Sequence, residues 1–245
     1  MYVRYRSHAL QLCLVNASKK KQDIKRVLNL CHKIFTFFEN SPLRTNELNQ
    51  IQLALYQNTR KLIKPIATRW FSYDRSFSII LETFASLCFT FKNLYKESGT
   101  LFCDAGGILV EMRKKSNVYI IIFLSKLFKV LSILSKISQS PKSKISTIYN
   151  LVQNTIVYLE NFDYTELTDD YTEKEHDLLS SGIVFNIDDD FRIQKYNGIF
   201  AGFLYQIMSN LKSRFGDPFI CLVDLESIFI DRSNSPNFQN LSKLF

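Results

Sequence analysis

The stretch KKQDIKRVLNLCHKIFTFFEN, residues 20–40, carries the period of a helix. Its apolar side chains recur every three or four residues, which places them on one face. The helix is expected to stop at Ser41-Pro42, where Ser can cap a new helix and Pro suits its first position. The apolar face consists of Ile24, Val27, Leu28, Cys31, Ile34, Phe35 and Phe38.

The same period continues along most of the chain, and turn-forming residues are scarce. With 7 Gly and 5 Pro among 245 residues, an all-β sandwich or a Gly-loop nucleotide fold is disfavoured. We predict an all-α fold, a helical bundle of about eight helices. Further helices are expected over residues 45–64, 70–95, 102–115, 118–137, 145–162 and 191–215, and residues 219–230 could form a helix or a strand.

Charge divides the chain into segments. The formal net charge is +8, yet residues 1–70 hold 13 Lys and Arg against 3 Asp and Glu, and residues 161–190 hold 1 against 10. We therefore expect a basic helical region over 1–160, an acidic loop or weakly helical connection over 161–190, a terminal helix with an apolar segment over 191–230, and a flexible tail over 231–245. The basic first third is the predicted anion-binding part.

The protein is predicted to be intracellular. The N-terminus lacks the long apolar region and small-residue cleavage site of a secretory signal, and residues 118–124 are too short to span a membrane. The five cysteines are scattered and odd in number, which favours a reducing compartment and buried thiols. We expect no membrane association.

Sequence signatures of catalysis and metal binding are weak. No CxxC, HxxxH or GxSxG pattern occurs, and the runs of Asp and Glu are typical of solvated loops. Gly106-Gly107 lacks the Lys-Ser/Thr of a phosphate loop, so close helix packing is the better explanation. We expect no cofactor and no metal.

Nucleic-acid binding is the function class that the basic residues favour. Phosphate neutralisation needs clustered cations, and Trp70 beside Arg69 could stack on a base. A solvated helix start and a core tryptophan are the alternatives. The predicted contacts are Arg4, Arg6, His8, Lys19, Lys20, Lys21, Arg69 and Trp70, with Lys25 and Arg26 in the same basic region.

Five local patterns resemble the hAT (hobo/Activator/Tam3) transposase superfamily. The resemblance is greatest to its domesticated zinc-finger MYM-type and repressor-of-the-inhibitor-of-the-protein-kinase group. Residues 5–12 resemble the CxxHxLNL motif, with His8 at the motif histidine and Tyr5 in place of the cysteine. The other patterns are residues 37–44 (FF-x-x-S-x-x-R), 68–70 (TRW), 131–139 (LS..LQ) and 196–215 (Y…F…L..RF). Within the last pattern, Tyr205 stands where the family has an Asp before the RF pair.

The resemblance implies a helical insertion domain of an RNase H-like transposase, without most of the RNase H-like core. The family's first two catalytic aspartates lie upstream of CxxH and its glutamate lies in a downstream segment, and this sequence has no counterpart of either. Two-metal phosphoryl transfer needs those carboxylates. The resemblance therefore implies a truncated, catalytically incompetent protein in the nucleus, in which Trp70 matches the tryptophan implicated in holding a flipped base.

Three readings of function follow. The first is a transposase-derived protein fragment that is not an enzyme and binds DNA through the basic first third. The second is a helical protein–protein interaction module, with a protein partner or a second copy of the chain docking on residues 161–190 and the apolar face of residues 191–215. The third is a decayed product without function. Phosphate binding weakens steeply with ionic strength, whereas apolar docking does not.

Overall fold

The computed structural model describes residues 2–19, 21–55, 58–66, 70–97, 103–216, 220, 221 and 223, but not the side chains of residues 2–7, 70, 71, 97 and 103. Ten helices and no strand occur within these ranges, so the all-α prediction is confirmed. The helices are α1 (Tyr2–Lys19), α2 (Gln22–Glu39), α3 (Pro42–Ala54), α4 (Trp70–Glu82), α5 (Phe84–Glu97), α6 (Cys103–Met112), α7 (Lys115–Gln139), α8 (Ile145–Glu160), α9 (Tyr164–Ser180) and α10 (Ile193–Phe215).

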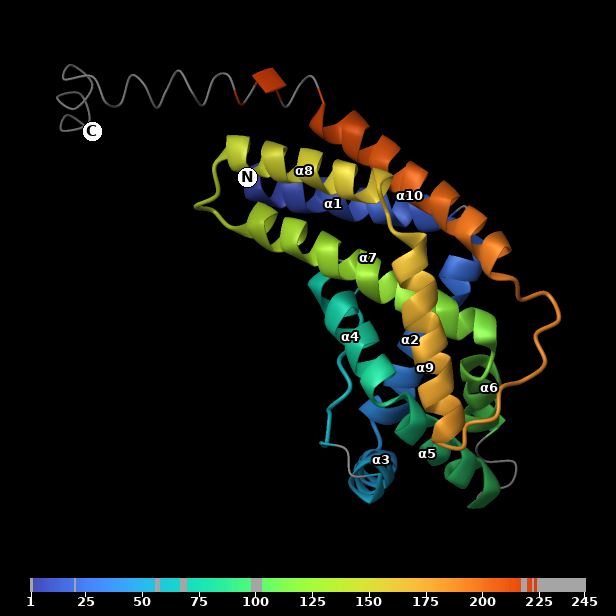
Figure 1. Cartoon of the computed structure of the whole chain (residues 1–245). Coiled ribbons are helices and arrows are strands. Elements are labelled where there is room, and N and C mark those ends of the chain that lie inside the picture. The colour runs from blue at the N-terminus through green and yellow to red at the C-terminus, as the bar shows by residue number, and fades with distance from the viewer. Residues whose placement is uncertain are drawn as a thin grey trace, which may run out of the picture.

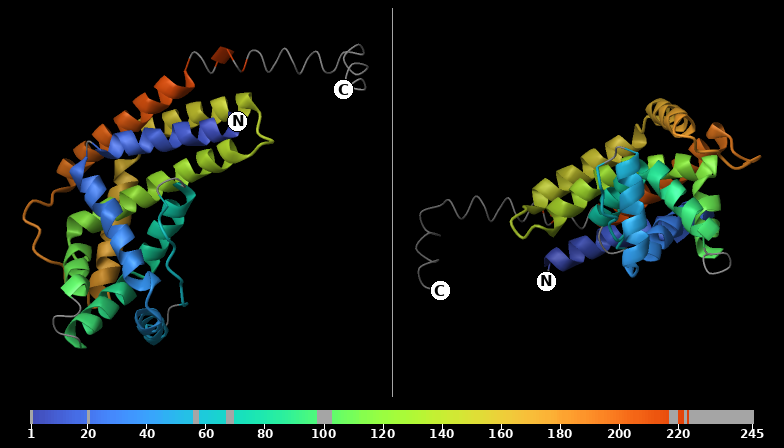
Figure 2. Two further views of the ribbon diagram at one scale, coloured as in Figure 1. Left: turned by 180° about the vertical axis from the view of Figure 1, so that it is seen from behind. Right: turned by 90° about the horizontal axis from the view of Figure 1, so that it is seen from below.

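Helix α7 is the centre of the fold. It packs with α1, α8 and α10 as a four-helix bundle, in which each helix contacts two neighbours around a shared core (Figures 1 and 2). The rings of Phe123 on α7 and Phe200 on α10 stack at 3.9 Å between centroids. On another side of α7, the ring of Phe128 stacks with Tyr73 of α4 at 5.1 Å.

Helices α2, α4, α6 and α9 pack on other parts of α7, whereas α3 packs on α2 and α5, and α5 packs on α4 and α6 (Figure 1). The predicted apolar face of α2 is largely confirmed: Ile24, Val27, Cys31, Ile34 and Phe38 are buried. Ser41 caps α3 by accepting a hydrogen bond from the Arg44 N–H at 3.4 Å, with Pro42 at the first helical position, as expected.

Of the two alternatives predicted for the acidic segment, the loop was wrong for Tyr164–Ser180, which forms the helix α9. Asp163 caps this helix by accepting from the N–H groups of Thr165 and Glu166 at 2.8 and 3.0 Å. The described chain between α9 and α10 remains non-helical, as expected. Leu167, Tyr171 and Leu178 form a buried stripe along this helix. The stabilisation from this stripe and from the Asp163 cap outweighs the repulsion among the acidic side chains.

Two predicted helices have different bounds. The helix expected over residues 45–64 ends at Ala54, because the buried Gln52 side chain bonds the backbone N–H and C=O of Arg60 and holds residues 58–66 as non-helical chain. The long helix expected from Trp70 to Tyr95 bends by 73° between α4 and α5. At the bend, the Thr83 hydroxyl donates to the carbonyl of Ile79 at 2.7 Å, a bond that often bends helices.

Within the described ranges, one helix, α7, is long and apolar enough to cross a membrane, and α4 with α5 would be another if the bent pair were one span. The apolar window of α7 is 72% buried inside the fold. That burial is typical of a core helix packed by its own chain. The flexible tail predicted over 231–245 and most of the apolar segment 219–230 lie outside the described residues.

Candidate nucleic-acid interface

Those predicted cations that the structure describes do not form a single site. Arg4 and Lys19 lie near opposite ends of α1, so about 22 Å of helix separates them. His8 and Lys19 are exposed. The Lys21 ammonium lies against α10, so close that a Cβ added at Gly202 would sit 2.7 Å from it. The side chains of Arg4, Arg6 and Trp70, and the whole of Lys20 and Arg69, lie outside the described residues.

A different set of cations lies together on the exposed face of α2. Lys25, Asn29 and Lys33 follow one another at four-residue spacing, so they form a row opposite the buried face. Lys25 and Lys33 are exposed, and neither makes an ion pair with any residue in the described ranges. The row therefore keeps two positive charges available to a ligand.

The row of α2 forms one wall of a groove, and α6 forms the other. We call it the α2–α6 groove. It consists of two hollows of about 520 and 550 Å³, which adjoin because Leu30, Lys33 and Glu111 line both. Gln22, Lys25, Arg26 and Asn29 complete the first hollow, and His32, Thr36, Phe37, Arg44, Asp104, Gly107 and Ile108 complete the second.

An arginine stacked on a phenylalanine ring closes the second hollow. The guanidinium carbon of Arg44 lies 4.1 Å from the centroid of the Phe37 ring, and its Nη1 donates to the Phe37 carbonyl at 2.8 Å. The Phe37 ring in turn packs against Phe91, with 5.0 Å between centroids. The guanidinium plane is thus held in one orientation at the edge of the groove.

The α6 wall contains the glycine pair. A Cβ at Gly106 would lie 2.9 Å from ring atoms of Tyr95, so close packing of α5 and α6 explains this glycine, as predicted. Gly107 is exposed in the groove, and a Cβ there would meet nothing within 4 Å. Packing within the described chain therefore does not explain Gly107.

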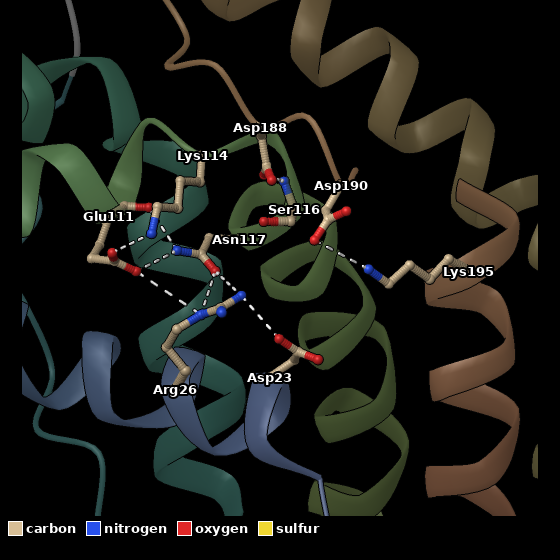
Figure 3. Close-up of polar contacts among 9 residues, drawn as sticks. All are labelled: Asp23, Arg26, Glu111, Lys114, Ser116, Asn117, Asp188, Asp190 and Lys195. Carbon is tan, nitrogen blue, oxygen red and sulfur yellow. Dashed lines mark hydrogen bonds and ion pairs between the residues drawn. The ribbon is translucent and has the colours of Figure 1, made fainter. Parts of the chain in front are cut away.

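A buried polar network closes the first hollow where α2, α6 and α7 meet (Figure 3). The Asn117 side chain is fully buried; its Oδ1 accepts from Arg26 Nε and Nη2 at 3.3 and 3.2 Å. Its Nδ2 donates to the backbone carbonyl of Glu111 at 2.7 Å and to Oε2 of Glu111 at 3.1 Å. Asp23 also pairs with Arg26, at 3.2 Å.

Glu111 is the acidic residue most deeply engaged in this network. Burial alone would raise the pKa of its carboxyl, but hydrogen bonds from Lys114 and Asn117 and the positive charges of Lys114 and Arg26 outweigh it, so the pKa lies below its ordinary value. The Lys114 ammonium lies 2.5 Å from Oε1 of Glu111. The carboxylate is therefore charged at neutral pH, with its charge compensated inside the protein.

The segment after α9 is held beside this polar network, at the first turn of α7 (Figure 3). The carboxylate of Asp188 accepts from the backbone N–H of Ser116 at 3.0 Å, in the first turn of α7, where a negative charge is favourable. Nearby, Asp190 and Lys195 are 3.8 Å apart. The Asp188 contact joins the segment after α9 to α7, whereas the carboxylate of Asp190 is 93% exposed.

Metal-ligand clusters and the reactivity of three buried thiols can be judged from the described residues. Nowhere in the described ranges do three or more His, Cys, Asp or Glu side chains gather closely enough to hold a metal ion. Burial raises the pKa of Cys13, Cys31 and Cys88 to about 12, which keeps these thiols protonated. The α2–α6 groove offers the exposed lysines Lys25 and Lys33 and the amide of Asn29, which are groups that can bind a ligand.

Sequence reasoning missed Lys33, Asn29 and Arg44. The four-residue spacing of Lys25, Asn29 and Lys33 was a usable signal, because it marks one exposed helix face. The opposing wall was not predictable, since α6 begins 64 residues after α2 ends. No protein-family model, curated protein or solved structure matches this chain.

Proposed function

We propose that this protein binds nucleic acid, that it derives from a hAT-like transposase, and that it performs no strand chemistry. The observation that carries the proposal is the pair of exposed lysines, Lys25 and Lys33, on one wall of the α2–α6 groove. Lysines without an internal ion pair retain their full charge for phosphate, and neutralising phosphate releases counterions. The net charge of +8 adds a long-range attraction for a polyanion.

The proposed descent rests on the sequence patterns, and the all-helical fold agrees with it. The FF-x-x-S-x-x-R pattern of residues 37–44 includes Ser41, which caps α3, and Arg44, which stacks on Phe37. The last residue of the TRW pattern, Trp70, is the first residue of α4. Ser41 and Arg44 therefore give the first of these patterns a structural role.

Binding is tested by fluorescence anisotropy with labelled single-stranded and double-stranded DNA and single-stranded RNA over a range of salt concentrations. We expect log K to fall linearly with log salt, with a slope of about −0.7 to −0.9 per phosphate contacted. The triple variant K19E/K20E/K21E tests the lysine run predicted from the sequence. An unchanged affinity and slope in this variant would exclude that run, and a parent protein without salt-dependent binding would refute the proposed function.

The alternative function, a protein interaction module, loses one of its predicted docking surfaces. The apolar face of α10 is not available, because Phe200, Phe203, Leu204, Ile207 and Leu211 are buried in the four-helix bundle. A different apolar patch favours this alternative: Val110, Val184 and Ile187 are 51, 66 and 88% exposed. Asn186 brings the two segments together by donating to the carbonyl of Val110 at 2.8 Å.

The exposed apolar patch of Val110, Val184 and Ile187 allows the protein interaction module to be tested separately from nucleic-acid binding. A single charge in the patch, Ile187→Asp, would abolish self-association or partner binding that depends on apolar contact, and this binding would change little with salt. Sedimentation velocity of the parent and the variant at low and high salt measures the self-association. If neither forms more than monomer at either salt concentration, the version of this alternative that rests on a second copy is wrong.

A further inference from the structure

The second half of α7 and the loop after it carry lysines that the fold does not neutralise. Between Glu111 and Glu160 the sequence contains no Asp or Glu, although Lys and Arg recur along this stretch. Within it, four exposed lysines make no ion pair with any residue that the structure describes. We call these four the α7–α8 basic face; they are Lys129, Lys136, Lys142 and Lys144.

The first half of α7 has the opposite arrangement. There the Lys115 ammonium lies 2.7 Å from a carboxylate oxygen of Glu175. The Lys126 ammonium lies 3.0 and 2.6 Å from carboxylate oxygens of Glu166 and Asp170. All three acidic residues belong to α9, which packs on this part of α7. The internal ion pairs therefore use the lysines at one end of α7 and leave those at the other end to solvent or a ligand.

The part of the α7–α8 basic face on α7 is a short row. Lys129, Ile133 and Lys136 lie three and four residues apart, so they share one face of the helix. The two lysines are about 10 Å apart along the axis. Asp74 of α4 accepts a hydrogen bond from the Ser132 hydroxyl at 3.3 Å, beside the row, but it pairs with neither lysine.

The rest of the α7–α8 basic face lies in the loop that continues from the row. Helix α7 ends at Gln139 and α8 begins at Ile145, and Lys142 and Lys144 lie between them. Lys144 is the N-cap residue of α8 and makes no side-chain capping bond. Its charge adds to the partial positive charge of the helix N-terminus. The row and the loop therefore present positive charge without interruption at one end of the bundle.

From these charges we infer a second nucleic-acid surface, in which the α7–α8 basic face binds the phosphate backbone of a duplex without reading its sequence. The inference rests on the proposed function, because it takes nucleic acid as the ligand. It adds a site outside the basic first third of the chain and states what that site recognises.

The spacing of the row agrees with the backbone of a duplex. Phosphates of one strand recur about every 3.4 Å along the axis of B-DNA. Two ammonium groups about 10 Å apart can thus contact phosphates three steps apart on one strand. The row keeps its spacing because it belongs to a continuous helix of 25 residues. A duplex is stiff and holds its phosphates at fixed intervals, which a flexible single strand does not.

The chemistry of the face favours contact with phosphate alone. Bases are read mainly by Arg, Asn and Gln side chains, and residues 129–144 include one of these, Gln139. The Gln139 amide donates to the Ser135 hydroxyl at 2.8 Å. A membrane surface needs a broad apolar face as well as charge. In α7, all of which the structure describes, Ile133 is the single large apolar side chain that is exposed.

The test reverses charge on the face in the full chain. K129E/K136E changes the row on α7, and K142E/K144E changes the loop. The probes are two labelled DNA duplexes of equal length, one AT-rich and one GC-rich. Fluorescence anisotropy over a range of salt concentrations measures binding, and circular dichroism melting checks that each variant is as folded as the parent.

The control makes the same change of charge elsewhere on the surface. K92E/K96E replaces two lysines of α5 that are exposed and unpaired with any described residue. Helix α5 lies at the other end of the molecule from the α7–α8 loop (Figures 1 and 2). A loss of binding that comes only from the lower net charge would appear equally in this control.

We expect K129E/K136E to weaken duplex binding by about 10-fold or more at low salt, and to reduce the salt slope by about 1.8, for two phosphates of a duplex. The neutral variant K129Q/K136Q should reduce the slope equally, and K142E/K144E should weaken binding in the same direction. The control should change affinity less than about 3-fold, through net charge alone. The AT-rich and GC-rich duplexes should bind within about 3-fold of each other, because phosphate contacts carry no sequence information.

The outcomes separate this inference from the proposed function. If K129E/K136E behaves like K92E/K96E while the parent binds DNA, the α7–α8 basic face is not a site, although the protein still binds nucleic acid. A strong preference for one duplex would show that contact is not with phosphate alone. If phosphatidylcholine–phosphatidylserine vesicles bind the parent and lose it in K129E/K136E, with DNA binding unchanged, the partner of the face is a membrane. A parent without salt-dependent binding to either duplex or to single strands would refute the proposed function itself.

Discussion

Arg26 and Asn117 are 91 residues apart in sequence, yet two nitrogen atoms of the arginine donate to the same amide oxygen of Asn117, at 3.3 and 3.2 Å. The amide is fully buried where α2, α6 and α7 meet, and it also bonds the backbone carbonyl of Glu111. One side chain thus holds the helix that carries the lysine row against the helix that forms the opposite wall. The groove depends on this junction for its shape.

The first prediction concerns the stability that the junction provides. Asn117→Ala removes the bonds to Arg26 and Glu111 and leaves their partners without replacement, so the free energy of unfolding should fall by about 2–3 kcal/mol. Urea unfolding followed by circular dichroism measures the change, with the m-value expected to stay constant. Asn29→Ala, on the exposed face of α2, is the control and should change stability by less than about 0.5 kcal/mol. Equal effects of the two substitutions would show that the buried amide is unimportant.

A second prediction concerns pH and Glu111. The folded-state pKa of this carboxyl lies below its ordinary value. The carboxylate therefore contributes stability above the unfolded pKa of about 4.3, and that contribution is lost as the pH falls through the lower folded pKa. Glu111→Gln should lower the free energy of unfolding at neutral pH, by less than about 1 kcal/mol for this partly exposed group. The gap between variant and parent should close in acid, and a gap that stays constant between pH 7 and pH 3 would contradict the assigned cause.

The sequence predicted those helices whose apolar residues repeat regularly. In α2, five residues of the predicted apolar face are buried, and Leu28 and Phe35 are half-buried at its edges. The pattern fails where a local contact decides the structure. Helix α9 was missed because its six acidic residues are typical of a loop, whereas Asp163 caps it and Lys126 holds Glu166 and Asp170 at 3.0 and 2.6 Å.

The site was less predictable than the fold, for a geometric reason. Arg4 and Lys19 belong to the same basic part of the sequence. They lie far apart in space because they are near opposite ends of the 18-residue helix α1. Lys33 and Gly107 are 74 residues apart, and they line the same hollow because α2 packs against α6. Periodicity reveals which face of a helix is buried, but it does not tell which helix covers that face. A groove between two helices is therefore hidden from a single sequence.

A third prediction concerns the cysteines. Burial raises the pKa of Cys13, Cys31 and Cys88 to about 12, so at pH 8 almost none of each is thiolate. Iodoacetamide should label Cys221, which is exposed, and leave these three unlabelled in the folded protein. All of them should react after unfolding in urea. Peptide mapping by mass spectrometry measures each site, and labelling of Cys31 as fast as Cys221 in the native state would contradict its burial.

The last prediction separates the two adjacent glycines of α6. Glycine within a helix is less stable than alanine by about 0.5–1 kcal/mol, so Gly107→Ala should raise the free energy of unfolding by that amount, because its new methyl meets nothing within 4 Å. Gly106→Ala should gain less or lose, since its methyl would lie 2.9 Å from the Tyr95 ring and displace it from α6. Urea unfolding of both variants measures the difference, and equal stabilisation would contradict the packing role of Gly106. If the α2–α6 groove holds nucleic acid close to α6, Gly107→Ala also weakens DNA binding while it stabilises the fold. Opposite signs in the two measurements are what a glycine retained for a ligand produces, whereas a gain in stability with unchanged affinity would show that no ligand approaches α6 at that point.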